Sequence, residues 1–153
     1  MKSLELKVPP PLVAVIVAAA MWGISRVTPR LEVAMVYRVW AGIVVAATGA
    51  LFSIGGVLAF RRARTTVNPM KPESASSLVD SGVYRITRNP MYVGLLLVLV
   101  AWATFLGAPL ALPGPLAFVL YIGRFQIAPE EVALTKLFGT EYAEYKAKVR
   151  RWL

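Results

Sequence analysis

The stretch NPMYVGLLLVLVAWATFLGAPLALPGPLAFVLYIG, residues 89–123, decides the fold because it contains no charged side chain. A helix rises about 1.5 Å per residue, so about 20 residues cross a hydrocarbon core of roughly 30 Å, and this run is too long for one crossing. Residues that interrupt a helix lie near its middle: Pro109, Pro113, Gly114 and Pro115. We therefore predict a helical hairpin with arms at 92–106 and 116–126.

Two further uncharged runs precede the hairpin, at 8–25 and 39–60. Hydrophobic residues make up 58% of the chain and charged residues 16%, a balance too apolar for a soluble domain. We predict an all-α polytopic membrane protein with about four transmembrane helices. A cleaved signal peptide is the alternative for the run at 8–25, but the prolines at 9–11 and the lack of a clear cleavage site after Trp22 argue against it.

The net charge of +9 is distributed unevenly along the chain. Four crossings would place both termini and the segment after the second run on one side of the membrane. That side holds fourteen of the seventeen basic residues, namely Lys2, Lys7, Arg61, Arg62, Arg64, Lys71, Arg85, Arg88 and the six from Arg124 to Arg151. Only Arg26, Arg30 and Arg38 fall opposite. The positive-inside rule predicts that both termini are cytoplasmic, with anionic lipid headgroups rather than nucleic acid as the partner of this charge.

The chain contains neither cysteine nor histidine. Their absence excludes disulfides, thiolate nucleophiles, histidine bases and most zinc sites, so we predict no metal. The sequence also lacks a Gly-rich phosphate fingerprint and the alternation of strands and helices that a Rossmann-type nucleotide site needs.

We predict one domain over 1–153, with two transmembrane helices in 1–60, a cytoplasmic loop at 61–91, the hairpin at 92–127 and a C-terminal amphipathic helix at 128–153. The loop could be a flexible linker by composition, but its end crowds polar and aromatic groups at the mouth of the hairpin, where Asn89 would cap a helix that begins at Pro90. The C-terminal helix has one apolar face and a potential bend at Gly139. The residues of that face are Leu134, Phe138, Tyr142, Tyr145, Val149 and Trp152.

Two motifs flank the hairpin. The first is Gly82-x-Tyr84-x-x-x-Arg88-Asn89-Pro90-x-Tyr92, and the second is Glu130-Glu131-x-x-Leu134-x-x-x-Phe138-Gly139-x-x-Tyr142-x-x-Tyr145. In this order and at this separation they resemble the isoprenylcysteine carboxyl methyltransferase family and related membrane phospholipid methyltransferases, over residues 74–152. The resemblance implies an S-adenosylmethionine-dependent enzyme, with S-adenosylhomocysteine as product, whose pocket on the cytosolic face admits a lipophilic acceptor from the bilayer.

Carried over by position, the resemblance implies a cofactor site formed by Ser76, Ser77, Leu78, Val79, Tyr84, Asn89, Pro90, Met91, Tyr92 and Glu130. Arg88 would add to this site by binding the carboxylate of the cofactor, or would instead bind a lipid phosphate. The resemblance implies that Gln126 contacts the acceptor. We expect Arg124, which is close by on the same segment, to contact the acceptor as well, and Arg124 and Glu130 to be the catalytic residues. We expect Glu131 to face solvent. The eukaryotic enzymes of the family have histidine at the position of Asn89 and arginine at the position of Gln126, so the acceptor is either a prenylcysteine-like carboxylate or another small isoprenoid or lipid.

Three other functions fit parts of the same pattern. A lipid amine N-methyltransferase would share the cofactor site, and its acceptor would need a base such as Glu130. A sterol-type reductase that binds NADPH would share the C-terminal bundle, and a membrane scaffold would share only the hydropathy and charge. Small residues on the second run, at Gly42, Ala46, Gly49, Gly55 and Gly56, permit close helix contact within one chain or between two.

Overall fold

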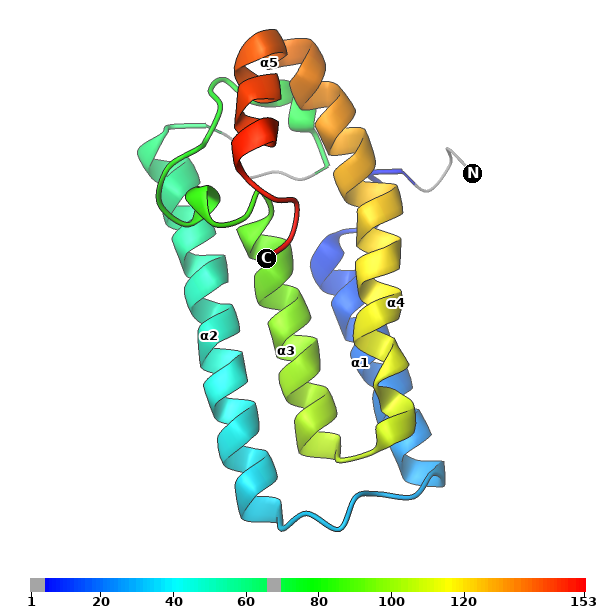
Figure 1. The fold of residues 1–153 in the computed structure, drawn as a ribbon. Helices are drawn as coiled ribbons and strands as arrows, with labels where there is room; N and C mark the ends of the chain where they lie inside the picture. The colour runs from blue at the N-terminus through cyan, green and yellow to red at the C-terminus, as the bar shows by residue number, and fades with distance from the viewer. Residues whose placement is uncertain (1–4, 66–69) are drawn as a thin grey trace.

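The computed structural model describes residues 5–65 and 70–153, and these residues form helices and connecting segments without a strand. Lys2, predicted to be cytoplasmic, lies outside the described residues. The all-α class predicted from the sequence is confirmed for the described part of the chain. The long helices run lengthwise through the molecule, and the first described residues lie at the same end as the C-terminal segment (Figure 1).

The first two helices agree with the apolar runs that predict them. Helix α1 spans Pro10–Val27 and α2 spans Met35–Arg62, and both are long and apolar enough to cross a membrane. Helix α2 therefore extends beyond the predicted run 39–60 at both ends, and its basic last turn, with Arg61 and Arg62, complements the negative end of the helix dipole.

The predicted hairpin is present. Helix α3 spans Pro90–Leu106, and Gly107 ends it in the left-handed conformation at φ 61°, where glycine is favoured. A short turn, η4 at Pro109–Ala111, leads to α4 at Pro113–Ile122, which has prolines in its first turn, where no amide hydrogen is needed. Arg38 of α2 donates from Nη1 to the carbonyl of Leu106 at 3.1 Å and so caps the end of α3.

The second arm of the hairpin continues into the C-terminal helix without a break. A π-helical turn, η5 at Gly123–Ile127, joins α4 to α5 at Ala128–Lys148. The run Pro109–Lys148 is the third segment long and apolar enough to span a membrane, whereas α3 is a shorter apolar helix. Within α5, Gly139 has φ 51° and ψ −118°, so the helix kinks there as predicted.

The C-terminal helix ends earlier than predicted. It stops at Lys148 rather than near 152, because the following residues leave the helical conformation and their carbonyls accept bonds from another segment. The Arg150 carbonyl accepts from the backbone amide of Arg88 at 2.9 Å, and the Arg151 carbonyl accepts from Thr87 and Asn89.

Helices α2 and α3 pack closely through small residues. Gly42, Gly49 and Gly56 of α2 are buried, and a Cβ added at Gly49 would lie 2.8 Å from the carbonyl oxygen of Gly94 on α3. Backbones approach this closely only where side chains are absent. The predicted small-residue stripe is therefore used at these positions for packing within the chain.

The core lies among α1, α3 and α4. Met21, Leu99, Phe118 and Ile122 are fully buried there. Trp102 of α3 also donates its indole N–H to the Ala18 carbonyl of α1 at 3.0 Å, which satisfies its polar group in an apolar setting. This bundle holds α3 and α5 in fixed positions relative to each other, and the pocket described next lies at their junction.

Candidate active site

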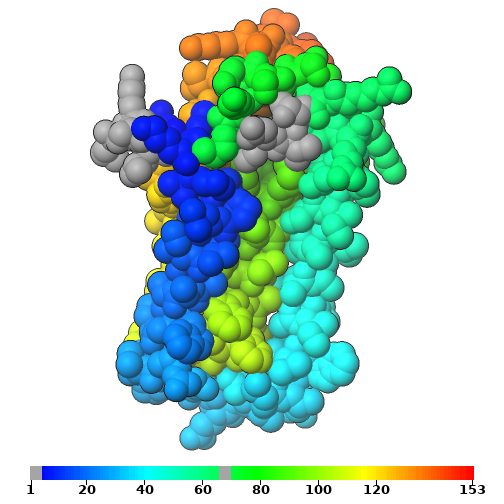
Figure 2. All heavy atoms as spheres, turned by 180° about the vertical axis from the view of Figure 1, so that it is seen from behind, coloured from blue at the N-terminus to red at the C-terminus, as the bar shows by residue number. Residues whose placement is uncertain are grey.

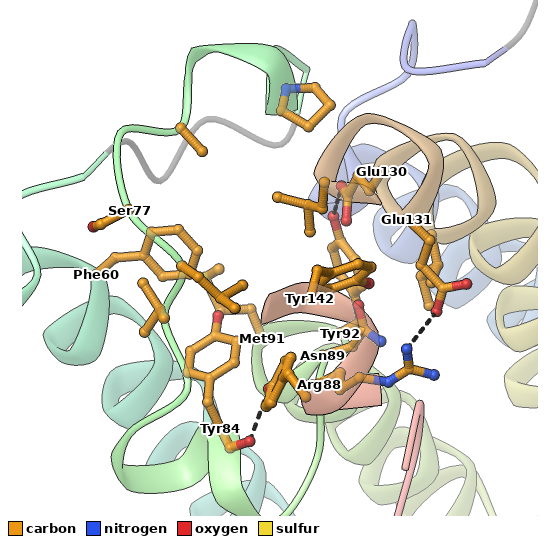
Figure 3. Close-up of a pocket in the computed structure, with 17 residues that line it drawn as sticks. Phe60, Ser77, Tyr84, Arg88, Asn89, Met91, Tyr92, Glu130, Glu131 and Tyr142 are labelled. Carbon is orange, nitrogen blue, oxygen red and sulfur yellow. Dashed lines mark hydrogen bonds and ion pairs between the residues drawn. The ribbon is translucent and has the colours of Figure 1, made fainter. Parts of the chain in front are cut away.

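A pocket opens at the end of the bundle that carries both termini, between the segment 70–91 and helices α3 and α5 (Figure 3). The space between its side chains amounts to about 840 Å³, which includes space that is open to solvent. Its lining consists of Phe60, Pro72, Ala75, Ser77, Leu78, Val79, Tyr84, Arg88, Asn89, Met91, Tyr92, Ile127, Glu130, Glu131, Leu134, Tyr142 and Tyr145.

The kink at Gly139 explains how α5 contributes two separate walls. Before the kink, α5 presents Glu130, Glu131 and Leu134 to the pocket. After the kink, the chain turns back toward the bundle, as Figure 1 shows, and presents Tyr142 and Tyr145. The Tyr145 hydroxyl donates to the Tyr84 carbonyl at 2.8 Å, which fixes the returning half of α5 against the loop.

Glu130 accepts hydrogen bonds from two side chains. Its Oε1 accepts the Tyr92 hydroxyl at 2.5 Å and the Gln126 amide Nε2 at 2.7 Å. Both donors use the same oxygen. Among the described residues no donor bonds Oε2, so that oxygen is available to a ligand hydroxyl or ammonium group.

Two arginines share the neighbouring carboxylate. Arg151 donates from Nε to Oε1 of Glu131 at 3.0 Å and from Nη2 to Oε2 at 2.6 Å, and these bonds raise the pKa of Arg151. Arg88 Nη1 lies 3.3 Å from Oε1 of the same carboxylate. The buried Nε and Nη1 of Arg88 nevertheless have no hydrogen-bond partner in the described part of the chain. An anionic ligand would satisfy such donors.

The opposite wall of the pocket is aromatic and apolar. The rings of Phe60 and Tyr84 meet edge to face with centroids 5.5 Å apart, and Leu78, Val79 and Met91 extend this wall. Burial raises the pKa of the Tyr84 phenol above its usual range, so this wall carries no charge at neutral pH. Such a surface suits a flat, weakly polar ring.

Most residues implied for the cofactor line this pocket. They are Ser77, Leu78, Val79, Tyr84, Arg88, Asn89, Met91, Tyr92 and Glu130. Ser76 and Pro90 do not line it. The exposed Ser76 donates its backbone amide to the Thr65 hydroxyl, and the buried Pro90 begins α3 on the side that faces Gly56 of α2.

The residues implied for the acceptor are placed differently. Arg124 does not line the pocket; its side chain is 50% exposed and pairs with Glu5 at 3.0 Å, because its position on η5 faces the N-terminal segment. A role for Arg124 on an acceptor therefore requires contact outside this pocket. Gln126 is buried behind the wall and contacts Glu130, so it orients that carboxylate from outside the lining.

Two expectations about side chains are wrong. Glu131 does not face solvent, since its side chain is only 12% exposed and pairs with Arg88 and Arg151. Asn89 occupies the cap position of α3, yet its side chain makes no cap bond, because its amide donates to the Arg151 carbonyl at 2.8 Å. Sequence reasoning missed Arg151 and Phe60, which stand outside the two motifs.

A separate apolar groove runs along the side of the bundle, among α1, α2 and α3. Figure 2 shows α3 between α1 and α2, which leave it partly uncovered. The groove begins one helical turn beyond Met91, at Leu95, and follows α3 past Val98 and Trp102 to Phe105. Its lining is almost wholly apolar, with Ala14 and Ala18 from α1 and Gly42 and Ala46 from α2.

The fold is that of a helical membrane protein with a pocket at one end of its bundle. A family model described as phospholipid methyltransferase matches residues 37–141, which is more than half of the chain. The chain belongs to the phospholipid methyltransferase family.

Relatives extend this finding. A probable protein-S-isoprenylcysteine O-methyltransferase from rice is 34% identical over 117 residues, 74% of this chain and 60% of that protein. Protein-S-isoprenylcysteine O-methyltransferase A from Arabidopsis thaliana is 30% identical over 71% of this chain and 55% of that protein. An uncharacterized protein from Haemophilus influenzae is 56% identical over 63 residues, 41% of this chain and the whole of that protein. The chain thus spans 55–60% of the length of these two plant relatives, and no solved structure matches it.

Proposed function

We propose that this protein transfers a methyl group from S-adenosylmethionine to a lipophilic acceptor that reaches the pocket from the bilayer. The observation that carries the proposal is the pairing, within one pocket, of an uncharged aromatic wall with Glu130 and Arg88. The buried Nε and Nη1 of Arg88 form no hydrogen bond within the described residues, and the contact of Nη1 with Glu131 is an ion pair at 3.3 Å. The names of the plant relatives, which are S-isoprenylcysteine O-methyltransferases, support the reaction class.

The pocket suits each part of the cofactor. The wall formed by Phe60, Tyr84 and Val79 would pack against adenine, and Oε2 of Glu130 would accept from a ribose hydroxyl or the ammonium group. The donors of Arg88 would bind the carboxylate of the methionine tail. When bound, the cofactor supplies a methyl group activated by the positive charge of its sulfur.

The contribution of the protein is then positioning and exclusion of water. Tyr92 and Gln126 hold Glu130 from two directions, so the carboxylate needs no rearrangement when a ligand arrives. Tyr142 and Tyr145, which are buried in the lining, would help to exclude water from the bound cofactor. The groove on α3 supports a lipophilic acceptor, because an isoprenoid or acyl chain could lie along Leu95 and Val98 while its polar end points toward Met91.

A lipid amine is the second candidate acceptor. The chain has Gln126 rather than a cation behind the pocket, Arg124 points away, and Glu130 is a buried carboxylate that could attract an ammonium group or take its proton. A carboxylate acceptor arrives ionised and needs no base, but it would need a cation. An amine acceptor therefore needs a carboxylate such as Glu130 near it, whereas a carboxylate acceptor needs a cation.

Binding tests the cofactor assignment. The purified protein in detergent is titrated with S-adenosylhomocysteine by calorimetry, alongside Glu130→Ala and the control Glu144→Ala, whose side chain is exposed on α5. We expect saturable binding that Glu130→Ala weakens at least about tenfold and Glu144→Ala leaves unchanged. Absence of binding by the folded wild-type protein would refute the assignment.

Transfer of tritiated methyl groups to extracted membrane lipids then distinguishes the acceptors. A methyl ester releases volatile methanol in alkali, whereas an N-methyl group stays on the lipid. Alkali-labile label would assign a carboxylate acceptor, and alkali-stable label would assign an amine. If the protein binds the cofactor but no tritium appears in either the alkali-labile or the alkali-stable lipid fraction, the acceptor is not a lipid.

A further inference from the structure

The C-terminal segment 149–153 packs beneath the pocket, although it contributes no residue to the pocket lining. Its backbone is fixed to the segment before α3 at three places. The Arg150 carbonyl accepts from the amide of Arg88, and the Arg151 carbonyl accepts from the hydroxyl of Thr87 at 3.1 Å and the side chain of Asn89. The segment is therefore in direct contact with the residues that carry the polar end of the pocket.

Two positively charged side chains share one carboxylate beside this segment. Glu131 is one carboxylate, and it faces two guanidinium groups, those of Arg88 and Arg151. Arg151 makes a two-point contact that uses both oxygens of Glu131. Arg88 approaches one of these oxygens at 3.3 Å but forms no hydrogen bond through Nε or Nη1 to a residue of the described chain.

From this asymmetry we propose that Arg151 is a positioning residue: it occupies Glu131 and thereby keeps the donors of Arg88 available to the anionic end of the cofactor. The inference rests on the proposed cofactor site. A fork-shaped guanidinium prefers a two-point contact with a carboxylate, and Glu131 can offer that geometry to one arginine at a time. Without Arg151, Arg88 turns fully onto Glu131, and its Nε and Nη1 leave the pocket.

The exposures of the side chains agree with this division of roles. Arg151 is 42% exposed, whereas Arg88 and Glu131 are 11% and 12% exposed. Arg151 therefore reaches Glu131 from the solvent side, whereas Arg88 and Glu131 both line the pocket. The buried carboxylate of Glu130 is held by Tyr92 and Gln126 and does not compete for Arg88 among the contacts described.

The test compares two ligands in calorimetric titrations of the full chain. S-adenosylhomocysteine has an amino acid tail with a carboxylate, and 5′-methylthioadenosine has the same nucleoside without that tail. We expect Arg151→Gln to lower the affinity for S-adenosylhomocysteine at least about tenfold, because a charge-assisted contact is lost. The affinity for methylthioadenosine should change by less than about twofold. Lys148→Gln, which removes an exposed charge from the last turn of α5, is the matched control and should change neither.

A second substitution separates positioning from simple anchoring of the C-terminal segment. If Arg151 acts by occupying Glu131, the double variant Arg151→Gln with Glu131→Gln leaves Arg88 without a competing carboxylate. S-adenosylhomocysteine affinity should then return to within about threefold of wild type. If Arg151 only anchors the segment, Glu131→Gln alone would weaken binding as much as Arg151→Gln, and the double variant would stay weak.

The outcomes are distinct. Rescue in the double variant together with tail-specific loss in Arg151→Gln supports the inference. Equal weakening of both ligands, absence of rescue, or no effect of Arg151→Gln overturns it while leaving the cofactor site intact. Failure of the folded wild-type protein to bind S-adenosylhomocysteine would overturn the proposed function itself.

Discussion

Glu130 places a carboxyl group in the largely apolar lining of the pocket. A buried carboxylate is costly unless donors surround it, and here the donors come from two helical segments, Tyr92 at the start of α3 and Gln126 just before α5. The contact between Tyr92 and Glu130 joins residues 38 positions apart. It therefore fixes the junction of the two helices as well as the orientation of the carboxylate.

Removal of the Tyr92 hydroxyl should destabilise this junction. We expect Tyr92→Phe to lower the free energy of unfolding by about 1–3 kcal/mol, because a buried acceptor loses a donor while the ring is kept. Urea unfolding in detergent, followed by tryptophan fluorescence, measures the change. Tyr121→Phe is the control, since its hydroxyl has no hydrogen-bond partner among the described residues. An equal effect of both substitutions would argue against the Tyr92–Glu130 bond.

The sequence predicts single residues of the site better than their pairings. The motifs identify Tyr84, Tyr92 and Glu130 because polar and aromatic groups at the mouth of an apolar hairpin stand out from their surroundings. No local pattern indicates that the Asn89 amide bonds a carbonyl 62 residues later, or that Arg151 reaches Glu131. Such contacts depend on where the chain returns in space, so the local pattern predicts a cap at Asn89 and a solvent position for Glu131.

At the scale of elements, the hairpin is predictable because proline and glycine interrupt an uncharged run that is too long for one crossing. The bend at Gly139 is predictable for a similar reason, but the end of α5 is not. The apolar spacing continues to Trp152, whereas the helix stops at Lys148 because the last carbonyls bond the segment before α3. A periodic pattern therefore shows which face is buried, and tertiary hydrogen bonds decide where the helix ends.

Gly139 makes a testable contribution to the shape of α5. Its backbone, at φ 51° and ψ −118°, is in a region that residues with a side chain rarely adopt. We expect Gly139→Ala to lower the free energy of unfolding by about 1–3 kcal/mol. It should also weaken S-adenosylhomocysteine binding, because Tyr142 and Tyr145 would no longer return to the pocket.

The matched control is Gly23→Ala on α1, where an added Cβ meets no atom within 4 Å and the helical conformation favours alanine. Urea unfolding and calorimetric titration measure both variants. We expect Gly23→Ala to keep binding and to leave stability equal or slightly higher. Retention of wild-type stability and binding by Gly139→Ala would mean that the kink is not needed for the pocket.

At the scale of the whole molecule, the pocket and most of the basic residues lie at one end. The pocket, both terminal segments and the basic residues around Arg61 and Arg85 lie there, while Arg26 and Arg38 lie at the other end with the α1–α2 connection (Figure 1). The cationic end would contact anionic headgroups, and by the positive-inside rule it would face the cytoplasm. A cofactor made in the cytoplasm would then enter the pocket directly, while a lipophilic acceptor would arrive along α3.

Because the chain has no cysteine, single substitutions can test this orientation without altering a background residue. Glu73→Cys places an exposed thiol in η2, Pro72–Ser74, at the pocket end, and Glu32→Cys places one in the α1–α2 connection at the other end. In intact bacterial cells, a membrane-impermeant maleimide should label Glu32→Cys at once and Glu73→Cys only after permeabilisation, because the basic end is retained on the cytoplasmic side. The reverse pattern would place the pocket outside the cytoplasm, away from the compartment in which S-adenosylmethionine is made.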